Sequence, residues 1–149
     1  MADNFQLFSE VVPALTAAER RWVQRVLADD ADAKLLQGAG IDPNAVDLDD
    51  WPGFEWEINP GNGELWLYAQ GCGNAAHAGE LVRALLARFR PADCWHLTWA
   101  ETCSKPRVSE FGGGALFVTA RAVRTTRAHN WVERQRKAYA RLSTRRKPR

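Results

Sequence analysis

The chain has 149 residues, of which 46% are hydrophobic and 26% are charged, a composition that fits one globular domain and excludes disorder of the bulk. No apolar run reaches the roughly 18 residues that a membrane span requires, and the first residues lack the basic and apolar regions of a signal peptide. The three cysteines therefore indicate free thiols, and we expect a cytoplasmic protein with one domain over residues 1–142 and a basic tail over residues 143–149.

Charge is distributed unevenly along the chain. Residues 1–120 hold 9 Lys/Arg and 17 Asp/Glu, whereas residues 121–149 hold 11 Lys/Arg and the single acid Glu133. The sequence thus predicts an acidic body with a basic C-terminal region, which suits an anionic partner. The seven tryptophans each bring a large ring and an N–H that needs an acceptor. We expect some of them in the core and others facing a partner.

The first third of the chain carries helical patterns. Thr16 and Glu19 form a capping box, and the apolar residues behind them recur at helical spacing, which predicts a helix over residues 17–36. Upstream, the apolar residues within 5–12 predict a short helical turn that Pro13 ends. Residues 38–53 are rich in Gly, Pro, Asp and Asn and predict a loop.

A hairpin and a helix follow. Residues 54–58 alternate apolar and acidic side chains, residues 64–69 are mostly apolar, and the Asn-Pro-Gly-Asn-Gly turn between them predicts a β-hairpin. An apolar stripe from Ala78 to Phe89, preceded by Asn74 and followed by Pro91, predicts the central helix.

The last third predicts two strands and a final helix. The strands cover residues 95–100 and 115–120, and a second capping box at Asn130 and Glu133 opens the helix. We therefore predict an α+β fold in which a largely antiparallel four-stranded sheet carries the central helix on one face, with helices at both termini. The other face either lies beneath the terminal helices or exposes aromatic and histidine side chains to a partner.

The turn before the central helix resembles a cofactor loop. Gln70, Gly71, Gly73 and Ala75 resemble the Gln-x-x-Gly-x-Ala turn of the GNAT acetyltransferases, whose backbone N–H groups hold the pyrophosphate of acetyl-CoA. A Gly-x-Gly-x-x-Ala pattern also fits here, but a dinucleotide fold needs more parallel units than this length allows. The alternative is a glycine turn capped by Asn74, with no cofactor.

The connection between the last two predicted strands, over residues 101–114, is much longer than a hairpin requires, and long irregular loops are often functional. Its hydroxyl and basic side chains offer donors to an anion, and its glycines leave backbone N–H groups approachable. We predict a partner-binding site made of Trp99, Glu101, Ser104, Lys105, Arg107, Glu110, Gly112, Gly113 and Gly114. The alternative is a flexible loop held by a structural acid–base pair.

The cysteines and histidines suggest little chemistry. Cys103 could act as a nucleophile with His96 as its base, but no orienting Asn or Asp can be placed, so we expect a small buried thiol and no catalytic residue. Cys94 and His96 share one face of a strand, yet no Cys-x-x-Cys spacing accompanies them, and we expect no metal site. We expect His77 and His129 to face solvent or to make local hydrogen bonds.

The basic C-terminal region suits phosphate contacts, because each neutralised phosphate releases counterions. We predict contact with nucleic acid or with an acidic partner through Arg134, Arg136, Lys137, Arg141, Arg145, Arg146 and Lys147. An acidic body would repel a polyanion unless this region is held apart from it. The alternative is a tail that folds onto Asp47, Asp49 and Asp50 of its own chain.

The run Trp-Ala-Glu-Thr-Cys-Ser-Lys-Pro-Arg over residues 99–107, with Glu-Phe-Gly-Gly-Gly-Ala-Leu-Phe-Val-Thr over residues 110–119, resembles the hallmark of a family. Its members are small uncharacterised bacterial proteins carried on plasmids, phages and integrative elements, and the resemblance covers about residues 64–135. The resemblance implies a setting and no mechanism. Small proteins in that setting often act by binding, as anti-CRISPR inhibitors of host defence do.

Three hypotheses of function follow. The leading one is a non-catalytic binding protein of a bacterial mobile element that engages a protein or ribonucleoprotein complex and inhibits a host defence system. The second is a GNAT-like N-acyltransferase that uses acetyl-CoA, and the third is a DNA- or RNA-binding protein. Sheet topology discriminates among them, because a parallel, splayed strand pair at the Gln70 turn favours the acyltransferase and an antiparallel sheet favours the binder.

Overall fold

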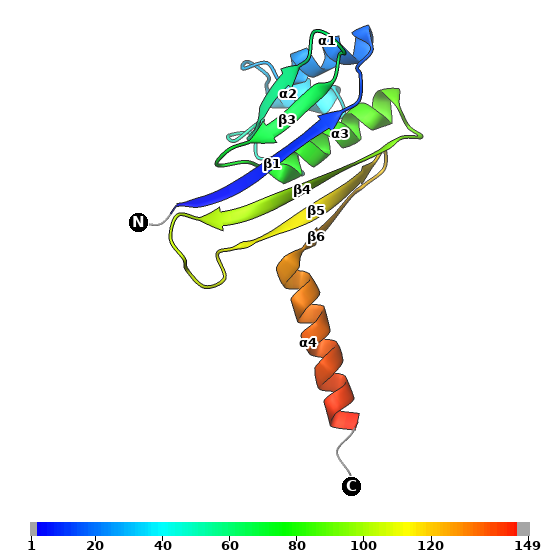
Figure 1. Cartoon of the computed structure of the whole chain (residues 1–149). Coiled ribbons are helices and arrows are strands. Elements are labelled where there is room, and N and C mark those ends of the chain that lie inside the picture. Colours follow the sequence, from blue (N-terminus) through cyan, green and yellow to red (C-terminus); the bar gives the residue numbers. More distant parts are fainter. Residues whose placement is uncertain (1–2, 146–149) are drawn as a thin grey trace.

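A computed structural model describes residues 3–145 and contains one antiparallel sheet of six strands, in the order β2-β3-β1-β4-β5-β6 (Figure 1). The strands are β1 (Asn4–Val12), β2 (Glu55–Ile58), β3 (Leu65–Ala69), β4 (Cys94–Cys103), β5 (Gly112–Thr119) and β6 (Val123–Arg127). The helices are α1 (Ala17–Val26), α2 (Ala33–Gly38), α3 (Ala75–Phe89) and α4 (Ala128–Arg145). The predicted α+β class and antiparallel sheet are confirmed, but the predicted number of four strands is wrong.

The first four strands follow a split β-α-β pattern. Strand β1 lies between β3 and β4 and pairs antiparallel with both. Helix α3 connects β3 to β4 and crosses over β1, and helices α1 and α2 connect β1 to β2 and cross over β3. Strands β5 and β6 extend the sheet beyond β4 as antiparallel neighbours. The two strands that the sequence analysis missed are therefore a central one, β1, and an edge one, β6.

The prediction of a helical turn over residues 5–12 is wrong, because this segment forms β1. Phe8 and Val12 are buried, whereas Ser9 and Val11 are exposed. Five apolar residues within eight positions fit a turn of helix as well as a strand, and the choice is made by pairing with β3 and β4 on both sides. Pro13 ends the strand instead of a helix.

The predicted helix over residues 17–36 is divided into α1 and α2. The capping box is confirmed, since Glu19 N–H donates to Thr16 and the Glu19 carboxylate accepts from Thr16 N–H. Helix α1 ends at Val26, and a new N-cap forms at Asp32, whose side chain accepts from Leu35 N–H. The acidic run before Leu35 therefore starts a second helix instead of continuing the first.

Helix α3 covers one face of the sheet together with α1 and α2 (Figure 1). Asn74 caps it as predicted, and ten of its fifteen residues are buried, including Leu81 and Leu85 at 0% exposure. His77 was expected to face solvent or to make local hydrogen bonds, but it is 2% exposed and bonds residues 25–30 positions away in the sequence. Its Nε2 accepts from Asp47 N–H at 2.9 Å, and its Nδ1 lies 3.0 Å from Pro52 O.

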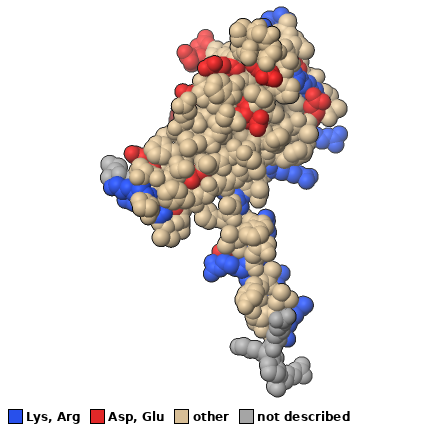
Figure 2. Space-filling model, in the orientation of Figure 1, with Lys and Arg blue, Asp and Glu red and all other residues tan. Residues whose placement is uncertain are grey.

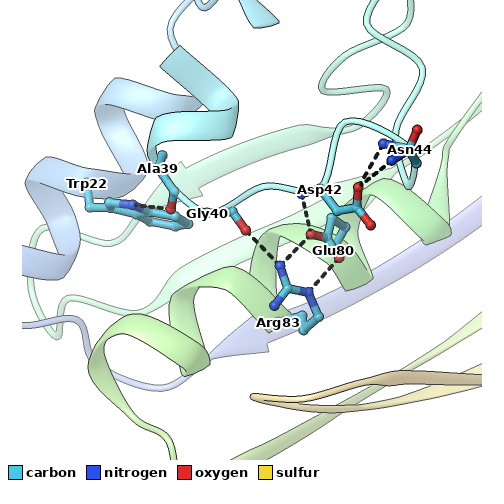
Figure 3. Close-up of polar contacts among 7 residues, drawn as sticks. All are labelled: Trp22, Ala39, Gly40, Asp42, Asn44, Glu80 and Arg83. Atoms are coloured by element: carbon cyan, nitrogen blue, oxygen red, sulfur yellow. Dashed lines mark hydrogen bonds and ion pairs between the residues drawn. The ribbon is translucent and has the colours of Figure 1, made fainter. Parts of the chain in front are cut away.

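A polar network fastens the loop after α2 to α3 (Figure 3). Glu80 is 3% exposed and accepts from Asp42 N–H and from Arg83, and Arg83 also donates to Gly40 O at 2.7 Å. Each buried charge is thus paired and hydrogen-bonded, as burial requires. The ion pair raises the pKa of Arg83 above its ordinary value.

The chain runs from β6 into α4 with no residue between them. Asn130 lies inside the helix, so the prediction that it caps the helix is wrong, whereas the prediction of a C-terminal helix is confirmed. Figure 1 shows α4 leaving the β6 edge of the sheet and projecting away from the body. Within residues 3–145, no helix is both long enough and apolar enough to span a lipid bilayer.

Candidate interaction surfaces

Among residues 3–145, no helix covers one face of the sheet, and we call this the open face. It is made by the side chains that alternate with the core residues: Glu55 and Glu57 of β2, Trp66 and Tyr68 of β3, Val11 of β1, His96 of β4, Phe117 of β5 and Arg124 of β6. Val11 is 40% exposed, Trp66 36% and Phe117 47%. The second alternative of the sequence analysis is thus the one observed: the terminal helices leave this face uncovered.

The aromatic side chains of β3 are held in place on the open face. Trp66 and Tyr68 stack with their ring centroids 3.9 Å apart, and Trp66 Nε1 donates to Ser9 Oγ at 2.8 Å. Tyr68 donates to the Glu57 carboxylate at 3.0 Å, and this bond raises the pKa of Tyr68 above its ordinary value. The result is a preformed apolar platform with an acid at its rim.

Beside this platform lies an open groove of about 470 Å³. It is lined by Val11, Glu57, Ile58, Asn59, Pro60, Glu64 and Trp66. Residues 54–69 contain three glutamates and no Lys or Arg. The β2–β3 end of the open face is therefore both apolar and acidic, which suits a ligand with apolar and cationic groups side by side.

The long loop is shorter than predicted, because β4 continues to Cys103 and β5 begins at Gly112. Ser104 is structural: its Oγ accepts from Asp3 N–H and its own N–H donates to Asp3 O. Glu110 accepts from the Cys103 thiol at 3.0 Å and lies 4.0 Å from Arg107. These contacts match the structural acid–base pair that was the alternative for this loop.

What the loop displays is a mixture of cations and apolar groups. Lys105 and Arg107 are exposed, and next to them Val108 is 93% exposed and Phe111 46% exposed. Val108 and Phe111 were not among the predicted site residues, although two apolar residues in an otherwise polar loop are a signal of an exposed contact.

The remaining residues predicted for this site lie within the sheet. Trp99 is 6% exposed, and its Nε1 donates to Glu101, which also lies 3.5 Å from Arg127 of β6. The three glycines belong to β5 and pair with residues 99–101. A Cβ at Gly114 would collide with the Trp99 ring, so this glycine allows the indole to pack.

Helix α4 has no buried residue. Its apolar side chains recur at helical spacing and form one stripe: Trp131 (58% exposed), Val132 (46%), Tyr139 (75%) and Leu142 (58%). Of the predicted basic residues, Arg134, Arg136, Lys137, Arg141 and Arg145 are on this helix, whereas Arg146 and Lys147 lie outside the described residues. Figure 2 shows basic side chains along α4 and acidic ones gathered over the β2–β3 end of the body.

The glycine turn makes its bonds within the protein. Gly73 N–H donates to Gln6 O, Ala75 N–H to the Gln6 side chain at 2.6 Å, and His77 N–H to the Asn74 cap. A pyrophosphate would have to displace the Gln6 side chain from Ala75 N–H, the Gln6 carbonyl from Gly73 N–H and the Asn74 side chain from His77 N–H. Strand β3 pairs antiparallel with β1, and one isolated parallel bridge joins Gln6 to Cys72 at the turn, whereas an acyltransferase turn calls for a parallel, splayed pair of strands.

The thiols and the exposed histidine are dispersed. Cys103 is buried, as expected, and Cys72 and Cys94 are exposed. His96 is on the open face, with its Nε2 4.0 Å from the Glu10 carboxylate. No group of three or more His, Cys, Asp or Glu side chains with metal-binding geometry occurs within residues 3–145.

Comparison of the chain with protein-family models, with curated proteins and with solved structures finds no match.

Proposed function

We propose that this protein is a non-catalytic binding protein that engages a macromolecular complex of protein or ribonucleoprotein type. The observation that carries the proposal is α4, an amphipathic helix of 18 residues with no buried residue. Apolar patches that stay exposed mark interaction sites, and cations beside them suit phosphate or carboxylate groups on the partner. Glu133 is the single acid among residues 128–145.

The displayed part of the β4–β5 loop offers a second contact. Arg107 beside Val108 and Phe111 provides one guanidinium and two exposed apolar groups on a short segment. Interfaces commonly concentrate binding energy in a few aromatic and arginine side chains. The loop and α4 would then contact one large partner at two points.

The setting in a mobile element, and inhibition of a host defence complex, form the part of the proposal that rests on the resemblance of residues 99–119 to the mobile-element family. A second candidate is direct binding to DNA or RNA. It is favoured by the row of cations on α4, which projects from the body and so holds its charge apart from the acids of the β2–β3 end (Figure 2).

Two experiments test the proposal. In the first, the affinity of the protein for single-stranded RNA and for duplex DNA is measured at several salt concentrations. In the second, the protein is used to capture partners from bacterial lysate with and without nuclease. The variant Arg134→Ala/Lys137→Ala/Arg141→Ala is compared with Arg21→Ala/Arg25→Ala/Lys34→Ala, which removes the same charge from exposed positions on α1 and α2. If α4 contacts duplex DNA, the first variant lowers the salt slope by about 0.9 per lost phosphate contact and the second leaves it unchanged.

Capture that survives nuclease and is lost in the α4 variant supports the protein partner. Capture that disappears with nuclease, together with a steep salt slope, supports nucleic acid. Equal capture and equal salt slopes for both variants would contradict the assignment of α4 as the contact surface.

A further inference from the structure

The apolar stripe of α4 and the open face are both exposed, and they are complementary in apolar side chains and in charge. The stripe of Trp131, Val132, Tyr139 and Leu142 could pack against the exposed apolar side chains of the open face, which are Val11, Trp66 and Phe117. In proteins, most helical stability comes from packing of an amphipathic face, so a helix without such packing is marginal. The question is therefore which surface covers the stripe.

Charge indicates the same match. Arg134, Arg141 and Arg145, spaced by seven and four residues, flank the stripe along one side of the helix. The open face carries Glu55 and Glu57 at its β2 edge. A helix that crosses the sheet with its C-terminal end over β2 brings Arg141 and Arg145 to the glutamates.

The length of α4 also matches the width of the sheet. At about 1.5 Å per residue, the 18 residues of α4 span about 27 Å. Six strands spaced by about 4.8 Å give a sheet about 24 Å wide. One helix therefore reaches from the β6 edge to the β2 edge.

The helix cannot reach the open face of its own chain without unwinding. Arg127 ends β6 and Ala128 begins α4, so no linker allows a reversal of direction. Figure 1 shows α4 pointing outward from the β6 edge and away from the body of its own chain. A helix held in this way is suited to exchange between two copies of a chain.

We infer that two copies of this chain form a two-fold dimer in which each α4 lies across the open face of the other. Two helices about 27 Å long and about 10 Å wide, counted on both partners, cover roughly 1,100 Å² before side-chain relief. That is close to the roughly 1,200–2,000 Å² of specific interfaces. The inference changes one part of the proposed function: the apolar stripe and the arginines that flank it contact a second copy, so that the outer cation Lys137 and the β4–β5 loop are the groups left for the other partner.

The first measurement is sedimentation equilibrium of the full chain over a range of concentrations. We expect a dimer in the wild type and in Ala140→Glu, which places the new charge away from the stripe. Leu142→Glu places the same charge within the stripe and should weaken the dimer by roughly 30-fold or more, the effect expected at a central contact. Circular dichroism confirms that each variant retains its fold.

The second measurement establishes which surfaces meet. Val11→Glu damages the open face and should also give a monomer. Mixing Val11→Glu with Leu142→Glu should restore a dimer with one intact exchange site, because the first variant keeps a good helix and the second keeps a good sheet. Glu57→Arg should weaken the dimer without adding a charge to the centre of the apolar platform.

Three outcomes would overturn the inference. One is a wild-type monomer at every concentration. Another is a dimer that survives Val11→Glu, which would indicate that the two α4 helices of the dimer pack against each other. The third is a dimer that survives Leu142→Glu, which would pair the two sheets. None of these results depends on nucleic acid or lysate, so the proposed function can fail or succeed separately.

Discussion

Helices α3 and α4 have similar lengths, and both carry an apolar stripe, yet their environments are opposite. Ten of the fifteen residues of α3 are buried, and none of the eighteen residues of α4 is. Helix α3 lies on the sheet and is fastened at both ends, by Asn74 at its start and by Arg90 at its end. The comparison teaches that the pattern which makes a helix amphipathic does not say which surface covers it, or whether that surface belongs to the same chain.

The largest expected effect on stability comes from a substitution in α3, the buried helix of the two. Leu85→Ala should lower the free energy of unfolding by about 2–5 kcal/mol, because Leu85 is 0% exposed and its removal leaves a cavity. Leu142→Ala, the matched change on α4, should stay within about 0.5 kcal/mol when measured at a concentration where the chain is monomeric. Urea unfolding measures both, and equal losses would mean that α4 is as well covered as α3.

The anchor at the end of α3 gives the next largest effect. Glu19 is 2% exposed and accepts from Arg90 Nε at 2.7 Å, and this hydrogen bond holds the pKa of Glu19 below its ordinary value. Glu19→Gln should cost about 1–3 kcal/mol at neutral pH, since the Arg90 charge then loses its partner.

The same pair predicts a dependence on pH. A lowered folded-state pKa means that the contribution is complete above the ordinary carboxylate pKa of about 4.3 and is lost as the pH falls through the lower folded value. Thermal melts of the wild type should therefore lose stability in that acidic range, and Glu19→Gln should lose less. Parallel pH profiles for the two proteins would contradict the role of this pair.

Smaller effects on stability are expected at the β4–β5 loop. Lys105→Ala with Arg107→Ala should change the free energy of unfolding by no more than about 0.5 kcal/mol, because both side chains are exposed. Capture of the partner should weaken. A double variant that unfolds would instead make these residues structural, and full retention of partner affinity would remove them from the interaction surface.

The smallest expected effect concerns the glycine turn. A ligand present at 100 times its dissociation constant stabilises a fold by about 2.7 kcal/mol, but acetyl-CoA should give no thermal shift, because Gln6 already engages Ala75 N–H and Gly73 N–H. Gln6→Ala serves as the comparison, since it frees the Ala75 N–H, whereas the Gly73 N–H keeps its bond to the Gln6 backbone carbonyl. A saturable shift in the wild type would favour the acyltransferase hypothesis.

Local signals predicted those elements whose ends are marked by short-range chemistry. Thr16 with Glu19, and Asn74 before its helix, act through side chains that bond backbone groups three residues away, so the sequence alone reveals them. The alternation of residues 54–58 and the glycine-containing turn after them predicted the β2–β3 hairpin for the same reason.

The failures share a physical cause as well. Strand β1 is defined by partners 53–99 residues away in the sequence, from Leu65 opposite Val12 to Cys103 opposite Asn4, and its local pattern also fits a helix. Strand β6 reads Val-Arg-Thr-Thr-Arg and has little apolar content, since as an edge strand it buries little. His77 became buried because the loop between α2 and β2, 25–30 residues away in the sequence, supplies Asp47 N–H and Pro52 O.

Of the predicted partner-binding residues, the sequence alone identified the exposed cations, because charged side chains without a buried partner remain in water wherever the chain places them. Only the tertiary structure separated them from Trp99, Glu101 and Ser104, whose polar atoms bond other groups of the same chain.

By itself, the sequence determined the α+β composition, the helix caps, the hairpin and the division into an acidic body and a basic end, since these depend on neighbours along the chain. The tertiary structure alone decided that one sheet face is covered and the other open, and that α4 leaves the edge of the sheet instead of folding over it. The reason is that burial depends on which elements meet in space, and an apolar stripe has the same periodicity whether its own chain or another one covers it.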